Sequence, residues 1–274
     1  MKKEEIYNLQ EKAKWLRIEL FKMLIKSKSG HIPSCFSMVE ILVSLYYGGI
    51  SNLNHVKYND EKRDRVLISK GHAAMALYPI LADLGNFEKN ELEKFTEVGG
   101  ILGLYADFRI PGIEGISGSL GHGVGMGAGF AYDAKINNEE FKTFVILGDG
   151  ECYEGSIWES AIFAASKQLD NLVVFVDRNN LCILGKTEEL LKLGDLKQKW
   201  ASFGWESYQI DGHDFNQIFN TITEIKVSKS CKPKVVICNT IKGKGVSFME
   251  GKAEWHNRVP SKELLELGIE ELKK

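Results

Sequence analysis

The sequence predicts a doubly wound α/β domain, with a mostly parallel sheet and helices on both of its faces. Three observations lead to this prediction. The chain has 274 residues, 44% of them apolar, which is enough for one large core. Five short β-rich runs alternate with helical patterns. These runs are continuously apolar, as is typical of strands buried on both faces of a parallel sheet. We therefore expect residues 1–274 to form a single domain.

The N-terminal part is predicted to be helical. Glu4–Lys28 carries apolar residues at helical spacing, and Gly30 is expected to end that helix. Ser37 is predicted to cap a second helix over Met38–Tyr47, with Glu40 at its N3 position.

Strands and helices then alternate along the rest of the chain. The expected strands are Arg65–Ser69, Thr143–Leu147, Leu172–Asp177, Trp205–Ile210 and Lys234–Asn239. The expected helices are Ala73–Leu84, Gly121–Lys135, Ser156–Gln168, Leu196–Phe203 and Phe215–Val227. Asp214 is predicted to cap the last of them. In such sheets ligands bind beyond the C-terminal ends of the strands, so the residues that follow each strand are the functional candidates.

Composition excludes several classes of function. Lys and Arg total 35 against 37 for Asp and Glu, and they are scattered, so no basic stripe points to nucleic acid. No apolar stretch approaches the roughly 20 residues that span a bilayer, and the charged N-terminus predicts no secretory signal. The five cysteines form no CxxC pair. They indicate reduced thiols in a cytoplasm rather than disulfides or a zinc site.

Polar residues follow two consecutive strands. Gly148-Asp149-Gly150 comes after the second strand, and Asn179 follows the third. Either motif alone reads as turn residues. The pair favours an Mg²⁺ shell of carboxylate, amide, backbone carbonyl and diphosphate oxygens. The glycines allow close approach of the backbone to a ligand, and the following helix N-terminus favours a phosphate.

This pattern resembles the thiamine-diphosphate motif of the transketolase family, including the helix that begins Glu154-Gly155-Ser156-Ile157-Trp158-Glu159. Further matching segments follow in the family's order through nearly the whole chain: Ser29-Gly30-His31, Leu67–Ala73, Gly118–Gly121, Ile210–Asp214, Lys242–Met249 and Trp255-His256. The resemblance implies thiamine diphosphate as cofactor. It also implies Mg²⁺, with Ca²⁺ or Mn²⁺ as substitutes, held by Asp149, Asn179 and the main-chain oxygen of Leu181.

The resemblance also implies roles for individual residues. It makes His31, His72, His256 and Glu154 catalytic, with His31 near substrate oxygens and the other two histidines near the diphosphate and the reacting carbon. Imidazole suits such roles because it titrates near neutral pH. Glu154 would join a carboxylate network at the interface between subunits. The implied cofactor-binding residues are His72, Gly118, Leu120, Gly148, Asp149, Gly150, Glu154, Asn179 and His256.

Other histidines are interpreted differently. His122 stands where the family usually has glutamine, His213 is assigned to structure, and His55 has no special context. The family's Gly-His-Pro, whose histidine lies at the substrate, is replaced by Gly103-Leu104-Tyr105-Ala106-Asp107, with Leu104 expected near the histidine's place. Because of this departure, the resemblance does not establish that the chain acts on the family's usual sugar phosphates. The expected cofactor is unaffected.

A full transketolase chain has three domains, and this chain matches the first. The resemblance therefore implies a partner subunit with the pyrimidine-binding and C-terminal domains, in an α₂β₂ assembly. The activity implied is transfer of a two-carbon ketol unit from a ketose or ketose phosphate to an aldehyde or aldose.

Several alternatives stay open at this point. Within the cofactor class they are the α subunit of a 2-oxoacid dehydrogenase, a deoxyxylulose-phosphate-synthase-like protein, and a transketolase for an unusual sugar of a surface polysaccharide. Outside catalysis, the chain is compatible with a protein that binds thiamine diphosphate as a signal. An NAD-binding domain is disfavoured, because the glycines from Gly123 to Gly127 do not follow a predicted strand.

Overall fold

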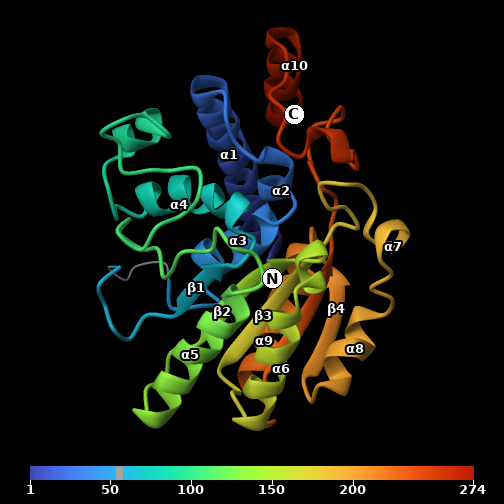
Figure 1. The fold of residues 1–274 in the computed structure, drawn as a ribbon. Coiled ribbons are helices and arrows are strands. Elements are labelled where there is room, and N and C mark those ends of the chain that lie inside the picture. The colour runs from blue at the N-terminus through green and yellow to red at the C-terminus, as the bar shows by residue number, and fades with distance from the viewer. Residues whose placement is uncertain (54–57) are drawn as a thin grey trace.

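The computed structural model describes residues 1–53 and 58–274, and its centre is a parallel sheet (Figure 1). Five strands pair in the order β1-β2-β3-β5-β4, all parallel. The strands are β1 (Arg65–Ile68), β2 (Thr143–Gly148), β3 (Leu172–Arg178), β4 (Glu206–Asp211) and β5 (Lys234–Asn239). The predicted fold class is confirmed.

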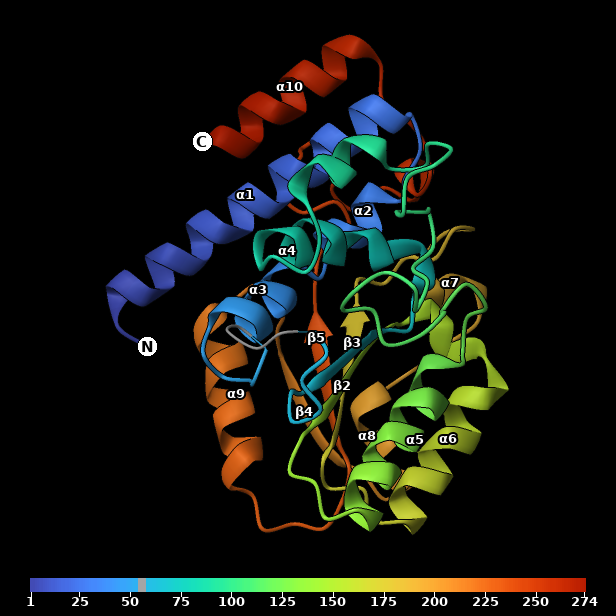
Figure 2. The same cartoon turned by 90° about the vertical axis from the view of Figure 1, so that its left-hand side faces the viewer.

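Helices cover both faces of the sheet (Figure 2). One face packs against α1 (Lys3–Ser27), α3 (Val39–Tyr47) and α9 (Phe215–Val227). The opposite face packs against α5 (Gly123–Ile136), α6 (Gly155–Ser166) and α8 (Leu196–Ser202). The remaining helices are α2 (Ile32–Phe36), α4 (Leu77–Asp83), α7 (Thr187–Leu190) and α10 (Lys262–Lys273), with 3₁₀ helices at Gly71–Ala76, Lys89–Lys94, Gly150–Tyr153 and Ala253–Trp255.

Side-chain alternation along the strands divides the core between the two faces. Phe144 and Ile146 of β2 point into the first layer, whereas Val145 and Leu147 point into the second. The change of helix layer follows from handedness. The helices α5, α6 and α8, which lead into β2, β3 and β4, lie on one face as the chain advances across the sheet. Strand β5 returns between β3 and β4, so a right-handed crossover must place α9 on the other face.

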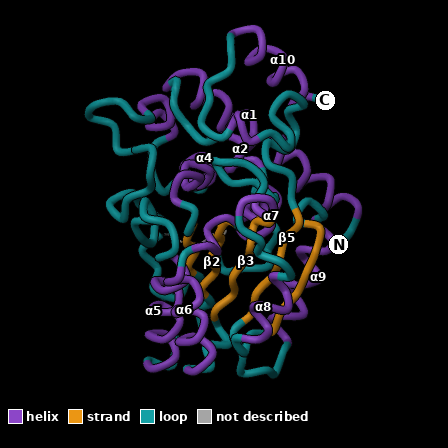
Figure 3. Tube along the Cα trace, turned by 45° about the vertical axis from the view of Figure 1, so that its right-hand side comes forward, coloured by secondary structure: helices purple, strands orange, loops and turns teal. Residues whose placement is uncertain are grey.

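Because all five strands are parallel, their C-terminal ends lie at the same edge of the sheet. The arrowheads of β3 and β5 point toward α2 in Figure 2, and Figure 3 shows α7 at this same edge. Among the described residues, no helix combines the length and the apolar character that crossing a bilayer requires.

Most predicted elements are present, with ends shifted by at most two residues. The predicted helix Ala73–Leu84 is instead a 3₁₀ turn followed by α4. The predicted cap at Ser37 is wrong: Met38 occupies the N-cap of α3, and the Ser37 hydroxyl hydrogen-bonds to Asp177 Oδ2 at 2.6 Å. Asp214 does cap α9. His55 lies outside the described residues.

A buried polar triad ties the N-terminal helices to the sheet. Arg17 of α1 donates two hydrogen bonds to Glu40 of α3, at 2.8 and 2.9 Å, and His213 Nδ1 lies 2.8 Å from Glu40 Oε2. The other ring nitrogen of His213 accepts from the Ile241 N–H at 2.8 Å. This agrees with the structural assignment of His213. Burial raises the pKa of Glu40, but the Arg17 charge and the hydrogen bonds outweigh it and lower the pKa to about 2.

Replacing Glu40 with Gln should therefore destabilise the fold by about 3 kcal/mol at pH 7, because Arg17 is left buried without its counter-charge. The folded-state pKa lies below the unfolded one. The stabilisation is thus complete above about pH 4.5 and is lost as the pH falls toward 2. Urea unfolding at several pH values measures this. Glu19→Gln, at a surface pair with Lys22, is the control and should change stability by under about 0.5 kcal/mol. The account would be contradicted if the difference in free energy of unfolding between Glu40→Gln and the unmodified chain did not shrink on acidification.

Candidate functional site

A cavity of about 480 Å³ lies at the C-terminal edge of the sheet. Ten of the eleven predicted site residues line it: His31, His72, Gly118, Leu120, Gly148, Asp149, Gly150, Asn179, Leu181 and His256. Two larger hollows, of about 650 and 600 Å³, lie beside Asp64 and beside Trp15 and contain none of them. The chemistry of the lining therefore singles out the smaller cavity as the candidate site.

Three histidine rings from distant segments meet in this cavity. His31 precedes α2, His72 follows β1, and His256 follows the last 3₁₀ helix. Their ring centroids lie 5.1 to 5.2 Å apart. Burial and neighbouring lysines lower the pKa of all three rings, to about 2 for His72 and about 3 for His256. The cluster is therefore neutral at physiological pH.

The Nδ1 atoms of His256 and His31 differ in their hydrogen bonding. Lys242 Nζ lies 2.8 Å from His256 Nδ1, and burial with the nearby Lys70 charge lowers the pKa of Lys242 to about 8. An ammonium at that position donates to Nδ1 and leaves the ring proton on Nε2. His31 Nδ1 is buried and has no hydrogen-bond partner in the described part of the chain. Such an orphaned atom fits a site that is completed by a bound group.

The predicted metal ligands lie at the ends of β2 and β3. Asp149 is 2% exposed and accepts from the N–H groups of Gly150 and Asn180, at 2.9 and 2.7 Å. Asn179 Oδ1 accepts from Leu181 N at 3.1 Å, and the Leu181 carbonyl accepts from Lys242 Nζ at 3.3 Å.

The electrostatic surroundings of Asp149 suit a bound cation. Burial and the neighbouring Asp177 raise the pKa of Asp149 to about 7. No described residue forms an ion pair with Asp149. Among the described residues no three His, Cys, Asp or Glu side chains cluster as metal ligands. A cation here would take a carboxylate, an amide, a main-chain oxygen and the oxygens of its ligand, a donor set that suits Mg²⁺.

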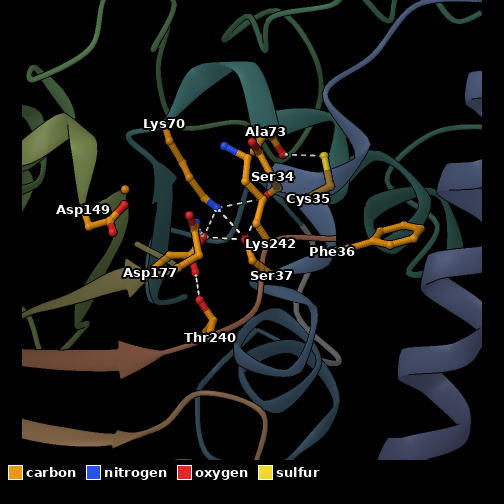
Figure 4. A network of polar contacts seen from close by, with 12 residues as sticks. Ser34, Cys35, Phe36, Ser37, Lys70, Ala73, Asp149, Asp177, Thr240 and Lys242 are labelled. Atoms are coloured by element: carbon orange, nitrogen blue, oxygen red, sulfur yellow. Dashed lines mark hydrogen bonds and ion pairs between the residues drawn. The ribbon is translucent and has the colours of Figure 1, made fainter. Parts of the chain in front are cut away.

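An ion pair missed by the sequence analysis lies beside Asp149 (Figure 4). Asp177, at the end of β3, is fully buried and pairs with Lys70 Nζ, which also donates to the Ser34 carbonyl at 2.7 Å. The Asp177 carboxylate further accepts from Ser37, Thr240 and Asn179 Nδ2. Burial raises its pKa, yet Lys70 and these donors hold it below the usual range. Asp177 thereby joins four segments of chain and fixes the Asn179 amide.

Glu151 is a second residue that the sequence analysis missed. It is 3% exposed and accepts from the Ser69 hydroxyl and from the N–H groups of Gly121 and Gly148, the last two at 2.9 and 3.1 Å. It thus ties the Gly118–Gly121 loop to the turn that carries Asp149. The sequence feature that could have indicated Glu151 is an acidic residue directly after Gly148-Asp149-Gly150.

Close packing explains the glycine of that loop. Gly121 has a φ of +88°, and a Cβ there would lie 2.6 Å from Ser156 Oγ and 2.7 Å from Glu154 Cβ. Glu154 itself is exposed, at the N-cap of α6, and does not line the cavity. Its predicted place in a carboxylate network between subunits stays a prediction. His122 is also exposed, with Nδ1 3.0 Å from the Leu120 carbonyl.

Leu104 and Tyr105 differ in where their side chains lie. Leu104 does not stand at the cavity, because its side chain packs against the core beside the first face of the sheet. The next residue, Tyr105, lines the cavity instead.

Comparisons with known proteins identify one family. The family model for the transketolase thiamine diphosphate binding domain matches residues 9–272. An apulose-4-phosphate transketolase subunit of Phocaeicola vulgatus is 38% identical over 98% of this chain and 95% of its own. The 6-deoxy-6-sulfo-D-fructose transketolase subunit SqwG of a Clostridium species is 36% identical over 99% and 98%. Transketolase of Campylobacter jejuni superposes with a TM-score of 0.90 at 28% identity, and the chain spans 43% of its length.

The buried pair generates a test of its own. Lys70→Met should destabilise the chain by about 3–5 kcal/mol in urea unfolding, because Asp177 is left as a buried unpaired charge. Adding Asp177→Asn should restore part of that loss, since the amide oxygen still accepts from Ser37 and Thr240. A double variant no more stable than Lys70→Met would show that the pair does not hold this edge together.

Proposed function

The chain belongs to the transketolase family, as its thiamine diphosphate binding domain, and on that premise we propose that it is the cofactor-holding subunit of a split transketolase. With a partner chain it would transfer a two-carbon ketol unit from a ketose or ketose phosphate to an aldehyde or aldose. One observation carries this proposal: Asp149, Asn179 and Leu181 share a single cavity with three neutral histidines. In this proposal residues 1–274 act as one domain.

Each part of the cavity receives a role in this proposal. Asp149, Asn179 and the Leu181 carbonyl would hold Mg²⁺, or Ca²⁺ or Mn²⁺ in its place. The loops around Gly118, Leu120, Gly148 and Gly150 would hold the diphosphate, with His72 and His256 beside it. The bound cofactor supplies the carbon nucleophile that the protein lacks.

The histidines would handle substrate oxygens and protons. Their lowered pKa values keep the rings neutral, so each can accept a hydrogen bond at one nitrogen and donate at the other. His31, with an unpartnered Nδ1, is assigned to substrate oxygens. His256, with its proton on Nε2, is assigned to donate to an oxygen near the reacting carbon. Glu154 would act at the interface between subunits.

A partner chain follows from two observations. Both of the split relatives described above are named as subunits, whereas the chain spans under half of the single-chain Campylobacter enzyme. Exposed apolar side chains also surround the cavity, namely Ile183, Leu184 and Leu190, at 57%, 80% and 48% exposure. A pyrimidine-binding domain seated on them would cover the site. We propose an α₂β₂ assembly in the cytoplasm, where the free cysteines stay reduced.

The substrate is proposed to be an unusual ketose. The two relatives take their names from apulose 4-phosphate and 6-deoxy-6-sulfo-D-fructose. The present chain also lacks the family's usual histidine at the substrate. A donor screen should therefore include branched and sulfonated ketoses beside the common ketose phosphates.

Asp149→Asn should weaken binding of thiamine diphosphate in the presence of Mg²⁺ by at least about 100-fold, because a ligand in direct contact should cost no less than the 10–100-fold of an outer-shell partner. Calorimetric titration of the assembled complex measures this, and Asp170→Asn, a surface carboxylate paired with Lys135, is the matched control. Unchanged binding in Asp149→Asn would remove Asp149 from the metal site.

Purification of the tagged chain from its native cell tests the split-enzyme proposal. A partner carrying the pyrimidine-binding domain should co-purify in equal amount, and only the mixture of the two chains should transfer ketol units. Ketol transfer by the isolated chain, or a stable assembly of this chain that ignores thiamine diphosphate, would contradict the proposal.

A further inference from the structure

The loop from Gly103 to Arg109 contributes Tyr105 to the cavity wall, and it carries hydrogen bonds on both sides of that residue. The Tyr78 hydroxyl donates to the Gly103 carbonyl at 2.9 Å. At the other end, the Asp107 carboxylate accepts from Arg109 N, Nε and Nη2 at 2.8 to 2.9 Å.

Buried side chains flank Tyr105 on both sides along the chain. Leu102 and Ala106 are 2% and 3% exposed, and Leu104 packs on the core. The backbone is thus fixed on both sides of Tyr105, which is 44% exposed and lines the cavity.

Tyr105 lies against the loop predicted to contact the cofactor. A Cβ added to Gly118 would lie 3.9 Å from the Tyr105 ring, an ordinary van der Waals contact, so the ring lies beside Gly118 with room for a small group between them. The Tyr105 hydroxyl has no hydrogen bond to any other described residue. The phenol is a donor and an acceptor, and its ring limits the room beside it. A group of this kind, at the open side of a cavity, suits a hydroxyl of a small polar ligand.

We propose that Tyr105 is a specificity-determining residue, whose hydroxyl hydrogen-bonds to a hydroxyl of the ketose donor. This rests on the proposed ketol transfer. Tyr105 would take over the substrate side of the cavity, where the family's usual histidine is absent. A phenol carries no positive charge and fills more of the space than an imidazole. The site is thereby biased toward the neutral hydroxyl-bearing part of the sugar and against donors that fit the histidine.

The test uses the assembled complex loaded with thiamine diphosphate and Mg²⁺. Tyr105→Phe removes only the hydroxyl, and Tyr105→His installs the family's usual side chain. Phe108→Leu is the control, because Phe108 is on the same loop, 63% exposed, and does not line the cavity. For each variant, kcat/KM is measured for xylulose 5-phosphate, fructose 6-phosphate and the best donor found, together with the affinity for thiamine diphosphate.

We expect Tyr105→Phe to lower kcat/KM for the best donor about tenfold, the effect of one lost neutral hydrogen bond, with unchanged cofactor affinity. Tyr105→His should shift the ratio of kcat/KM between that donor and xylulose 5-phosphate at least about fivefold. Phe108→Leu should change neither quantity.

Two results would overturn the role of Tyr105 alone. One is an active complex in which both Tyr105 variants keep the donor preference of the unmodified protein. The other is an equal loss for every donor that tracks a loss of cofactor affinity, which would make Tyr105 a cofactor contact. An unmodified complex that binds the cofactor yet neither binds nor cleaves any ketose would overturn the proposed function, and this inference with it.

Discussion

The buried ion pair between Lys70 and Asp177 is the interaction on which the rest of the site depends. It joins the end of β1 to the end of β3, and through Ser37 and Thr240 it reaches α2 and the segment after β5. A buried charge that lost its partner would be costly, so these segments have to stay together. The cavity is built on the edge that this pair closes.

The charged groups near that pair, Asp149 and Lys242, are compatible with the proposed binding of a cation together with an anion. Asp149 is buried beside a second carboxylate and has no described partner of opposite charge in ion-pair contact, which favours a metal ion. Lys242 lines the same cavity and contacts the neutral ring of His256. In the proposed function, a magnesium ion would bind at Asp149 and a diphosphate would bind near Lys242 and the histidines. His31 Nδ1 is buried without a hydrogen-bond partner in the described part of the chain, and Asp149 has hydrogen bonds but no ion pair there, as suits a site completed by a bound group.

The sequence alone was sufficient for the parallel sheet, because strands such as Leu172–Arg178 are continuous apolar runs that only a two-sided sheet buries. It also located Asp149 and Asn179, since both follow strands whose ends meet. It could not assign Lys70, because its partner lies 107 residues away. Ser37 failed as a cap for a similar reason: its hydroxyl bonds to a side chain 140 residues distant. Tyr105 was missed because loop residues have no periodicity that fixes which side chain faces a cavity.

The most direct test of the central claim is a crystal structure of the assembled complex grown with thiamine diphosphate and Mn²⁺, with anomalous scattering recorded for the metal. The account predicts one manganese peak per site, coordinated by Asp149, Asn179 and the Leu181 carbonyl, with the diphosphate beside His72 and His256. A peak elsewhere, or a cofactor bound outside this cavity, would contradict it.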